Sequence, residues 1–266
     1  MLPYNKAVLL AGGHGTRLQP LTYYCNKHLL PLYRKNQQAV PIIESAVSQL
    51  YWSGFWDVAV ILGDFRAEDI ISFFHKYIKP KYKTMNFTYY YQGEPLGIAH
   101  AVSLAKDFVK DRQYFLVYLG DNYFSEILYP DYISGLYPVT PDWSCSCSLL
   151  FAEVKDPTRF GSPVFDKNKN LVKIVEKPKK PQTNLALTGC YLFNTTFYFD
   201  AYKYLKPSKR GEYELTDIIN EALKFDPNLV HWKVFDGFWS DAGTFQSIYN
   251  IQKYINRQEE TNHSKN

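Results

Sequence analysis

Cysteine is scarce in this sequence: its 266 residues include only Cys25, Cys145, Cys147 and Cys190. Four cysteines are too few for the disulfide scaffold of a small secreted domain, and no pair has the C-x-x-C spacing of a zinc site or a redox centre. The six histidines also lack metal-ligand spacing, and we expect none of them to be catalytic. The sequence therefore predicts reduced thiols and a cytoplasmic protein.

Long apolar runs are absent as well. The apolar stretches 7–11, 58–62 and 115–119 have the length of strands, far below the roughly 20 residues of a membrane-spanning helix. The first stretch is also shorter than the apolar core of a secretion signal and has no cleavage-site pattern. We expect neither secretion nor a membrane partner.

The sequence has no strong excess of one charge. Its 30 Lys and Arg residues stand against 26 Asp and Glu residues, which gives a net charge of +4. So small an excess does not indicate binding to nucleic acid or to an anionic membrane. Any anionic ligand must therefore be held by particular side chains and main-chain groups.

The features that are present favour one large α/β domain. Hydrophobic residues make up 46% of the sequence and charged residues 21%, which is enough to bury a core. In the first half, short β-branched and aromatic runs alternate with helical apolar spacing, which is typical of βαβ units and a mostly parallel sheet. Helices are predicted near 43–51, 70–78 and 97–108, and strands at 6–11, 57–62, 87–91 and 114–119.

From Cys145 onward, strands follow one another with little helix between them. These strands, which predict an inserted antiparallel region packed on the first sheet, lie at 146–154, 163–166, 171–176 and 186–193. The remaining predicted elements are helices at 196–205 and 214–223, a strand at 230–235 and a last helix from Thr244. We expect a Rossmann-like mostly parallel central sheet flanked by helices, in a single domain over 1–257, followed by a polar, disordered tail at 258–266.

The most informative motif is the glycine-rich turn after the first predicted strand, Leu10-Ala11-Gly12-Gly13-His14-Gly15-Thr16-Arg17-Leu18. Glycines in such a turn let the main chain approach a phosphate and point N–H groups at it. No Gly-Lys-Ser/Thr follows, which excludes a Walker A loop. Leu18 stands where G-x-G-x-x-G needs its third glycine, which argues against a dinucleotide-dependent oxidoreductase. Arg17 and Lys27 place two cations beside the turn.

Two aspartates are candidate metal ligands. Asp121 follows an apolar run and a glycine, so its carboxylate should emerge at the carboxyl end of a parallel strand, where open α/β sheets bind ligands. Asp241 lies in a Trp-Ser-Asp-Ala-Gly turn before the last predicted helix. Either alone could cap a turn or a helix. Since Mg²⁺ is held by one or two carboxylates together with phosphates and water, we predict that the two aspartates bind Mg²⁺.

Three further positions could contact a substrate. Pro178 predicts an extended exit from the strand that ends at Glu176, and this would point Lys177 out of the sheet. The lysine could then hold a phosphate and the glutamate could accept hydrogen bonds from sugar hydroxyls, although taken alone they form an ordinary surface ion pair. Gln92 precedes a predicted helix, and its amide matches the imide edge of a pyrimidine.

Together these motifs resemble the signature of the sugar-1-phosphate nucleotidyltransferases, L-A-G-G-x-G-T-R-L-x-P-x-T followed by K-x-L-x-P, which residues 10–22 and 27–31 match. Within the family the pattern is most similar to the short form of the glucose-1-phosphate thymidylyltransferases. The resemblance covers residues 5–252, because further segments match in the family's order: 92–99, 120–122, 176–178, 188–189, 210–212, 216–217 and 239–243.

The resemblance implies that a nucleotidyl group passes from dTTP to glucose 1-phosphate, which gives dTDP-glucose and pyrophosphate. Arg17 would neutralise the pyrophosphate, Lys27 the α-phosphate region and Lys177 the incoming sugar phosphate. The implied nucleotide-binding residues are Leu10, Gly12, Gly13, Gly15, Thr16, Gln92, Gly97 and Asp121. The implied sugar-phosphate residues are Gly161, Glu176, Lys177, Gly189 and Arg210. The resemblance also implies a homo-oligomer, a tetramer, with Mg²⁺ as cofactor.

Two segments depart from the thymidylyltransferase pattern, namely Asn36-Gln37-Gln38 and Phe160-Gly161-Ser162-Pro163. Phe160 stands where the family usually has a tyrosine, so one possible polar contact to the sugar is missing. The identity of the sugar 1-phosphate therefore stays open. Two alternatives remain: a UTP-dependent uridylyltransferase for a related sugar 1-phosphate, and a noncatalytic homologue that binds nucleotide sugars. The second would be expected to have lost Arg17, Lys27 or a metal carboxylate, and all of these are present.

Overall fold

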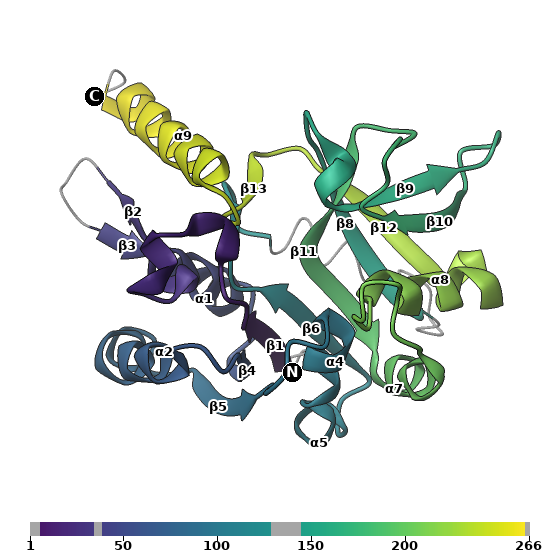
Figure 1. Cartoon of the computed structure of the whole chain (residues 1–266), viewed down its shortest axis with the longest axis horizontal. Helices are drawn as coiled ribbons and strands as arrows, with labels where there is room; N and C mark the ends of the chain where they lie inside the picture. The colour runs from purple at the N-terminus through teal and green to yellow at the C-terminus, as the bar shows by residue number, and fades with distance from the viewer. Residues whose placement is uncertain (1–5, 35–38, 129–144, 264–266) are drawn as a thin grey trace.

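The computed structural model describes residues 6–34, 39–128 and 145–263. Among them, seven strands form one central sheet (Figure 1). In spatial order they are β12 (Val230–Phe235), β8 (Cys147–Glu153), β11 (Leu185–Asn194), β6 (Tyr114–Leu119), β1 (Lys6–Ala11), β4 (Asp57–Leu62) and β5 (Asn86–Tyr91). Strands β6, β1, β4 and β5 are parallel, β12 is parallel to β8, and β11 is antiparallel to both of its neighbours. The predicted Rossmann-like, mostly parallel α/β fold is confirmed.

Strand β1 shows how the sequence produces a layer of helices on each face of this sheet. Ala7, Leu9 and Ala11 belong to one buried cluster, whereas Val8 and Leu10 belong to another. Because successive side chains of a strand point to opposite faces, an unbroken apolar strand must be covered on both sides. Helices α1 (Ile42–Trp52) and α2 (Ala67–Phe73) cover the first face. The second face is covered by α4 (Ile98–Ser103), α5 (Lys106–Val109), α7 (Thr195–Tyr204) and α8 (Leu215–Phe225).

The last helix, α9 (Phe245–His263), packs beside the segments that follow β1 rather than on the sheet (Figure 1). Its Ile251 is buried in a third cluster with Leu18 and Leu32. The hairpin of β2 (Pro31–Tyr33) and β3 (Ala39–Pro41) is held to α9 by the amide of Gln252, which bonds both main-chain groups of Tyr33 at 2.6 and 2.8 Å. Helix α9 thereby supports the loop that continues from the glycine-rich turn.

The predicted antiparallel region is present in part as a separate sheet. Strands β9 (Gly161–Phe165) and β10 (Leu171–Glu176) form an antiparallel pair outside the central sheet. The strands predicted at 146–154 and 186–193 instead extend the central sheet as β8 and β11. Almost every residue of β11 is buried, and a strand with both faces buried needs a central place between two neighbours.

Two further boundaries differ from the prediction. The single helix predicted at 97–108 is two short helices, α4 and α5. The helix predicted at 70–78 consists of α2, a π-helical turn (Phe74–Ile78) and the short α3 (Lys79–Lys81). The disordered tail predicted at 258–266 is wrong for 258–263, since α9 continues to His263, and residues 264–266 lie outside the described residues. Residues 258–260 are polar, but Gln and Glu are strong helix formers and do not need burial to continue a helix.

Candidate active site

The glycine-rich turn follows the carboxyl end of β1 and has the backbone that glycine permits. Gly13 and Gly15 have φ angles of +100° and +62°, in the left-handed region. A Cβ atom on Gly15 would lie 2.8 Å from the methyl carbon of Thr22, whose hydroxyl donates a 2.8 Å hydrogen bond to the Gly15 carbonyl. The turn leads into a short 3₁₀ helix (Thr16–Leu18) that leaves Arg17 exposed. Both features fit a loop that holds an anion.

The ends of three parallel strands meet beside this turn. Gly63, directly after β4, approaches so closely that a Cβ on it would lie 3.3 Å from both Gly12 Cα and Gly13 N. Gln92, directly after β5, places its Oε1 3.2 Å from where a Cβ on Gly12 would stand. Ligands of open α/β sheets bind at such carboxyl ends. The absence of side chains at these glycines keeps this edge open.

A cavity of about 250 Å³, here called the first cavity, opens at this edge. Its walls combine apolar side chains such as Ile61 and Ala101 with the amide of Gln92, whose Nε2 donates a 3.2 Å hydrogen bond to the Gly97 carbonyl. Of the residues predicted to bind a nucleotide, those lining it are Leu10, Gly12, Gly13, Gln92, Gly97 and Asp121. Gly15 and Thr16 lie outside it, in the turn that positions Arg17.

Asp121 forms an ion pair with Lys27, from Nζ to Oδ2 at 2.5 Å. Burial alone would raise the pKa of the Asp121 carboxyl, but the charge of Lys27 and hydrogen bonds from Lys27 and Asn122 hold this pKa below its usual range. The neighbouring His28 is buried, and its pKa is lowered to about 3 by burial and by the charge of Lys27. Asp121 is therefore a carboxylate, and His28 a neutral side chain, at neutral pH.

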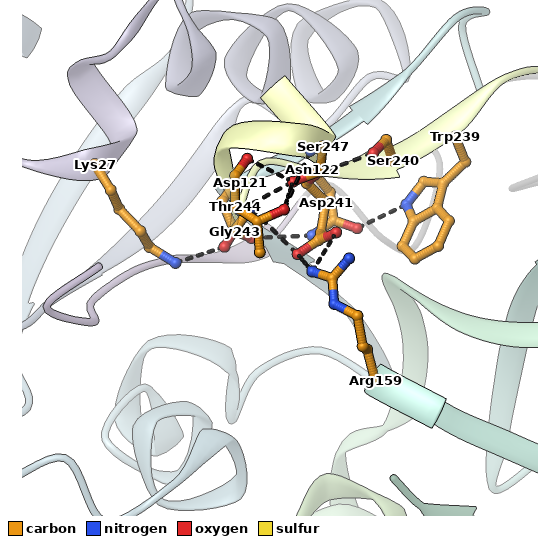
Figure 2. Close-up of polar contacts among 10 residues, drawn as sticks. All are labelled: Lys27, Asp121, Asn122, Arg159, Trp239, Ser240, Asp241, Gly243, Thr244 and Ser247. Carbon is orange, nitrogen blue, oxygen red and sulfur yellow. Dashed lines mark hydrogen bonds and ion pairs between the residues drawn. The ribbon is translucent and has the colours of Figure 1, made fainter. Parts of the chain in front are cut away.

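A short antiparallel ladder brings the second predicted metal ligand to the first. Strand β7 (Asn122–Phe124) pairs with β13 (Trp239–Asp241), and Asn122 stands opposite Asp241. Figure 2 shows that the side chain of Asp241 is bound by Arg159, whose Nη2 donates to Oδ1 and Oδ2 at 3.1 and 2.8 Å. Burial raises the pKa of Asp241; Arg159 opposes this shift, and the nearby charge of Asp121 adds to it.

Asn122 is the centre of the hydrogen bonds that fix this ladder. Its Nδ2 donates to Asp121 Oδ1 at 3.0 Å and its Oδ1 accepts from Trp239 Nε1 at 2.7 Å (Figure 2). The same Oδ1 accepts a 3.0 Å hydrogen bond from the Gly189 amide. A Cβ on Gly189 would lie 2.6 Å from the Asn122 side chain, so only glycine fits there. Gly189, predicted to bind the sugar phosphate, thus also gives space to Asn122.

A second cavity, of about 180 Å³, lies on the other side of Asp121. It shares Asp121, Ile98 and Leu119 with the first cavity, so the two cavities adjoin there. The predicted residues that line it are Arg17, Asp121, Gly161, Glu176, Lys177, Gly189 and Asp241. The fold therefore gathers residues from distant parts of the sequence around one junction.

Lys177 lines the second cavity, but its main-chain conformation differs from the one predicted from the sequence. Its φ angle is +44°, in the left-handed region, rather than the extended exit predicted from Pro178. The Lys177 amide donates a 3.0 Å hydrogen bond to the Phe160 carbonyl, which holds this conformation. Its side chain is 47% exposed and lies 3.6 Å from Glu176, whose pKa is raised by burial.

Arg210 lines neither cavity. Its guanidinium bonds both oxygens of Glu214 at 2.8 and 2.9 Å and lies 3.7 Å from Glu176.

Of the two segments that depart from the family pattern, Asn36-Gln37-Gln38 lies outside the described residues. Phe160 packs edge-on against Trp239, with ring centres 5.1 Å apart. Sequence reasoning assigned no role to Asn122, which lies in the matched segment 120–122, or to Arg159, which directly precedes the segment 160–163 that departs from the family pattern.

The pair of aspartates suits a cation that also binds phosphates. Both line the second cavity and both offer hard carboxylate oxygens. Among the residues that the structure describes, no group of three or more His, Cys, Asp or Glu forms an all-protein metal site. Mg²⁺ fits a site of this kind, because it binds one or two carboxylates and completes its shell with phosphates and water.

The family described as nucleotidyl transferase matches residues 6–258. The chain belongs to this family. The match confirms the resemblance to the sugar-1-phosphate nucleotidyltransferases that the motifs indicated. Within the described part of the chain, no helix combines the length and apolar composition needed to cross a membrane.

Several members of the family are similar to this chain over nearly its whole length. The low-salt glycan biosynthesis nucleotidyltransferase Agl11 of Haloferax volcanii is 38% identical over 94% of this chain and 66% of its own length. A glucose-1-phosphate thymidylyltransferase of Neisseria meningitidis is 33% identical over 94% of this chain and 82% of its own length. A crystal structure from Bacillus anthracis, assigned as a glucose-1-phosphate thymidylyltransferase and complexed with sucrose, matches with a TM-score of 0.81 and 36% identity over 94% of both chains. The chain spans just under two thirds of the Haloferax relative.

Proposed function

We propose that this protein transfers a nucleotidyl group from dTTP to glucose 1-phosphate and releases pyrophosphate. The observation that carries the proposal is the junction of the two cavities at Asp121. The first cavity offers the glycine-rich turn and Gln92 to a nucleotide, and the second offers Glu176 and Lys177 to a sugar phosphate. The likeness to the Neisseria and Bacillus proteins supports dTTP and glucose 1-phosphate as the substrates.

This reaction needs no general base from the protein. The second pKa of a phosphate monoester is about 6, so the attacking oxygen of glucose 1-phosphate is already ionised at pH 7. It forms a bond to the α-phosphorus of dTTP as the bond from that phosphorus to the pyrophosphate oxygen breaks. The remaining difficulty is to bring two polyanions together in line, and the protein contributes positioning and charge stabilisation.

Three cations near the junction suit this task. We assign Arg17 to the departing pyrophosphate, Lys27 to the α-phosphate region and Lys177 to the phosphate of the incoming sugar. Arg17 and Lys177 line the second cavity, while Lys27 lines the first and packs 3.6 Å from the position of a Cβ on Gly13. Lys27 therefore reaches the junction from the first cavity, and Arg17 and Lys177 reach it from the second.

Asp121 and Asp241 are the proposed ligands of Mg²⁺. When bound, the cation would supply positive charge to the phosphates around the α-phosphorus. Asp121 directly precedes β7 and Asp241 ends β13, and the hydrogen bonds of Asn122 and the Gly243 amide orient the two carboxylates. The protein thus fixes two hard oxygen ligands and leaves the rest of the shell to phosphates and water.

A coupled measurement tests the proposal. Purified protein is supplied with dTTP, glucose 1-phosphate and Mg²⁺, and pyrophosphate and the nucleotide sugar are measured together. We expect both products in equal amounts, and neither without the sugar phosphate or after chelation of the metal. The same assay with UTP tests the uridylyltransferase alternative. Pyrophosphate release that does not depend on the sugar phosphate would contradict the assignment, and no turnover with any pyrimidine triphosphate would favour a noncatalytic binding protein.

A further inference from the structure

Each proposed metal-binding carboxylate forms an ion pair with a cation of the chain itself. Lys27 binds Asp121 and Arg159 binds Asp241, as Figure 2 shows. One nitrogen of Arg159 contacts both oxygens of Asp241, so the guanidinium takes the position from which a divalent cation would approach this carboxylate. The role of Lys27 follows from the sequence motif, whereas the motif-based assignments give no role to Arg159.

Arg159 joins a fixed main chain to a partly exposed side chain that lines the second cavity. Its main chain is the last residue of a 3₁₀ helix (Pro157–Arg159) fixed by Asp156, which accepts a 3.1 Å hydrogen bond from the Thr158 amide. Its side chain is 31% exposed, lies 5.1 Å over the ring of Phe160 and lines the second cavity together with Lys177. The long arginine side chain therefore reaches both Asp241 and the space proposed for the sugar phosphate.

We propose that Arg159 is a positioning residue that couples metal binding at Asp241 to sugar-phosphate binding. This inference rests on the proposed function. Without a divalent cation, the guanidinium holds Asp241. When the carboxylate turns to the cation, Arg159 leaves it and binds the phosphate beside Lys177.

Two physical reasons support this exchange. A guanidinium and a divalent cation compete for the same two carboxylate oxygens, so removal of one favours the other. A guanidinium that has lost its carboxylate still needs a charged partner, and its planar array of donors matches a phosphate. By reciprocity, each of the two ligands then increases the affinity for the other.

The first test uses Mn²⁺ alone, with free Mn²⁺ measured by electron paramagnetic resonance. We expect Arg159→Gln to bind Mn²⁺ about tenfold more tightly than the wild type, because a charge-assisted hydrogen-bond pair no longer competes. Arg257→Gln is the matched control. Arg257 is an exposed arginine of α9 that lines, together with Arg159, a further cavity of about 640 Å³, and its loss should leave the Mn²⁺ affinity within twofold. Arg159→Lys keeps the charge without the planar donors and should give an intermediate affinity.

The second test measures glucose 1-phosphate binding by calorimetry with and without Mg²⁺, and inorganic phosphate serves as a second probe in case the sugar differs. In the wild type the cation should tighten binding, and in Arg159→Gln this ratio should fall towards one. Unchanged Mn²⁺ affinity together with an unchanged ratio in Arg159→Gln would overturn the inference. If Asp241→Asn still weakens Mn²⁺ binding in that case, the proposed function stands. If thermal unfolding shows that Arg159→Gln does not fold, Arg159→Lys replaces it in the test. Wild-type Mn²⁺ affinity in Arg159→Lys would then overturn the inference.

Discussion

The amide of Ala242 donates a 2.8 Å hydrogen bond to the carbonyl of Asp121. This bond continues the ladder of β7 and β13, in which Asn122 stands opposite Asp241. The two proposed metal ligands are far apart in the sequence and belong to no common strand of the central sheet. Their approach therefore depends on this short ladder and on the hydrogen bonds that hold it.

The first prediction concerns the charge of these two ligands. Asp121→Asn and Asp241→Asn should each lower kcat by about 100-fold or more, because a neutral amide stabilises a cation and its bound phosphates far less than a carboxylate does. Thermal unfolding should show that both variants keep the fold. Steady-state kinetics over a range of Mg²⁺ concentrations measure kcat for the wild type and both variants. Near-normal, Mg²⁺-dependent rates in both variants would show that the metal assignment is wrong.

The fold could be predicted best where local pattern and tertiary environment agree. Strands β1, β4 and β6 have an apolar residue at nearly every position and end where the sequence places their ends. The position of β11 could not be predicted, because an apolar strand is compatible with a separate sheet or with the central one. The pairing of β11 with β6 decides this, and that contact has no signal in the sequence.

The candidate site, too, could be predicted from the sequence only in part. The glycine-rich turn carries its own signal, since positive φ angles and close approaches require glycine. The roles of Asn122 and Arg159 depend on partners elsewhere in the chain: Trp239 and Gly189 for the first and Asp241 for the second. An asparagine or an arginine by itself is an ordinary surface residue, so only the folded structure reveals these contacts.

The second prediction concerns the packing of Asn122 against Gly189. Gly189→Ala should destabilise the protein, because the new methyl group would stand 2.6 Å from the Asn122 side chain. Asn122→Ala should also destabilise it, by about 1–3 kcal/mol, because it leaves the Trp239 N–H and the Gly189 amide without an acceptor.

Urea unfolding of the double variant tests this contact directly. Since Asn122→Ala removes the side chain that the methyl group would strike, the double variant should lose less stability than the sum of the two single changes. Gly189 does not have a positive φ angle, so the substitution adds no left-handed backbone strain to the predicted clash. Additive losses at 122 and 189 would contradict the predicted clash.

The third prediction concerns pH and His28. Its pKa is lowered from 6.5 to about 3 in the folded protein, so between these values the unfolded state binds more protons than the folded state. The stability that neutral His28 contributes is therefore complete above pH 6.5 and is lost as the pH falls towards 3. By pH 5.5 the loss should be about 1.4 kcal/mol.

Urea unfolding at pH 7.5, 6.5 and 5.5 measures this loss in the wild type and in His28→Gln. The glutamine variant can be less stable throughout, but the fall in its free energy of unfolding between pH 7.5 and 5.5 should be smaller by that amount. Effects of the acidic residues on stability are common to both proteins and cancel in the difference. Parallel curves for the two proteins would contradict the buried, neutral state of His28.

The last prediction concerns the base of the nucleotide and the amide of Gln92. In the first cavity its Nε2 has one hydrogen bonded to the Gly97 carbonyl, which leaves its second N–H and its Oε1 for the imide edge of a pyrimidine. Thymine and uracil share that edge and differ by one methyl group, which is worth roughly 1–3 kcal/mol in an apolar pocket. We expect dTTP to be the best substrate, UTP a measurable second, and ATP and GTP poor ones.

Gln92→Leu should lower kcat/KM for dTTP and UTP by a similar factor and leave their ratio nearly unchanged, because the amide does not contact the methyl group. Gln246→Leu, at an exposed position on α9, is the control and should leave both constants unchanged. Side-by-side values of kcat/KM for the four triphosphates make the measurement, and a clear preference for a purine would contradict both the role of Gln92 and the choice of dTTP.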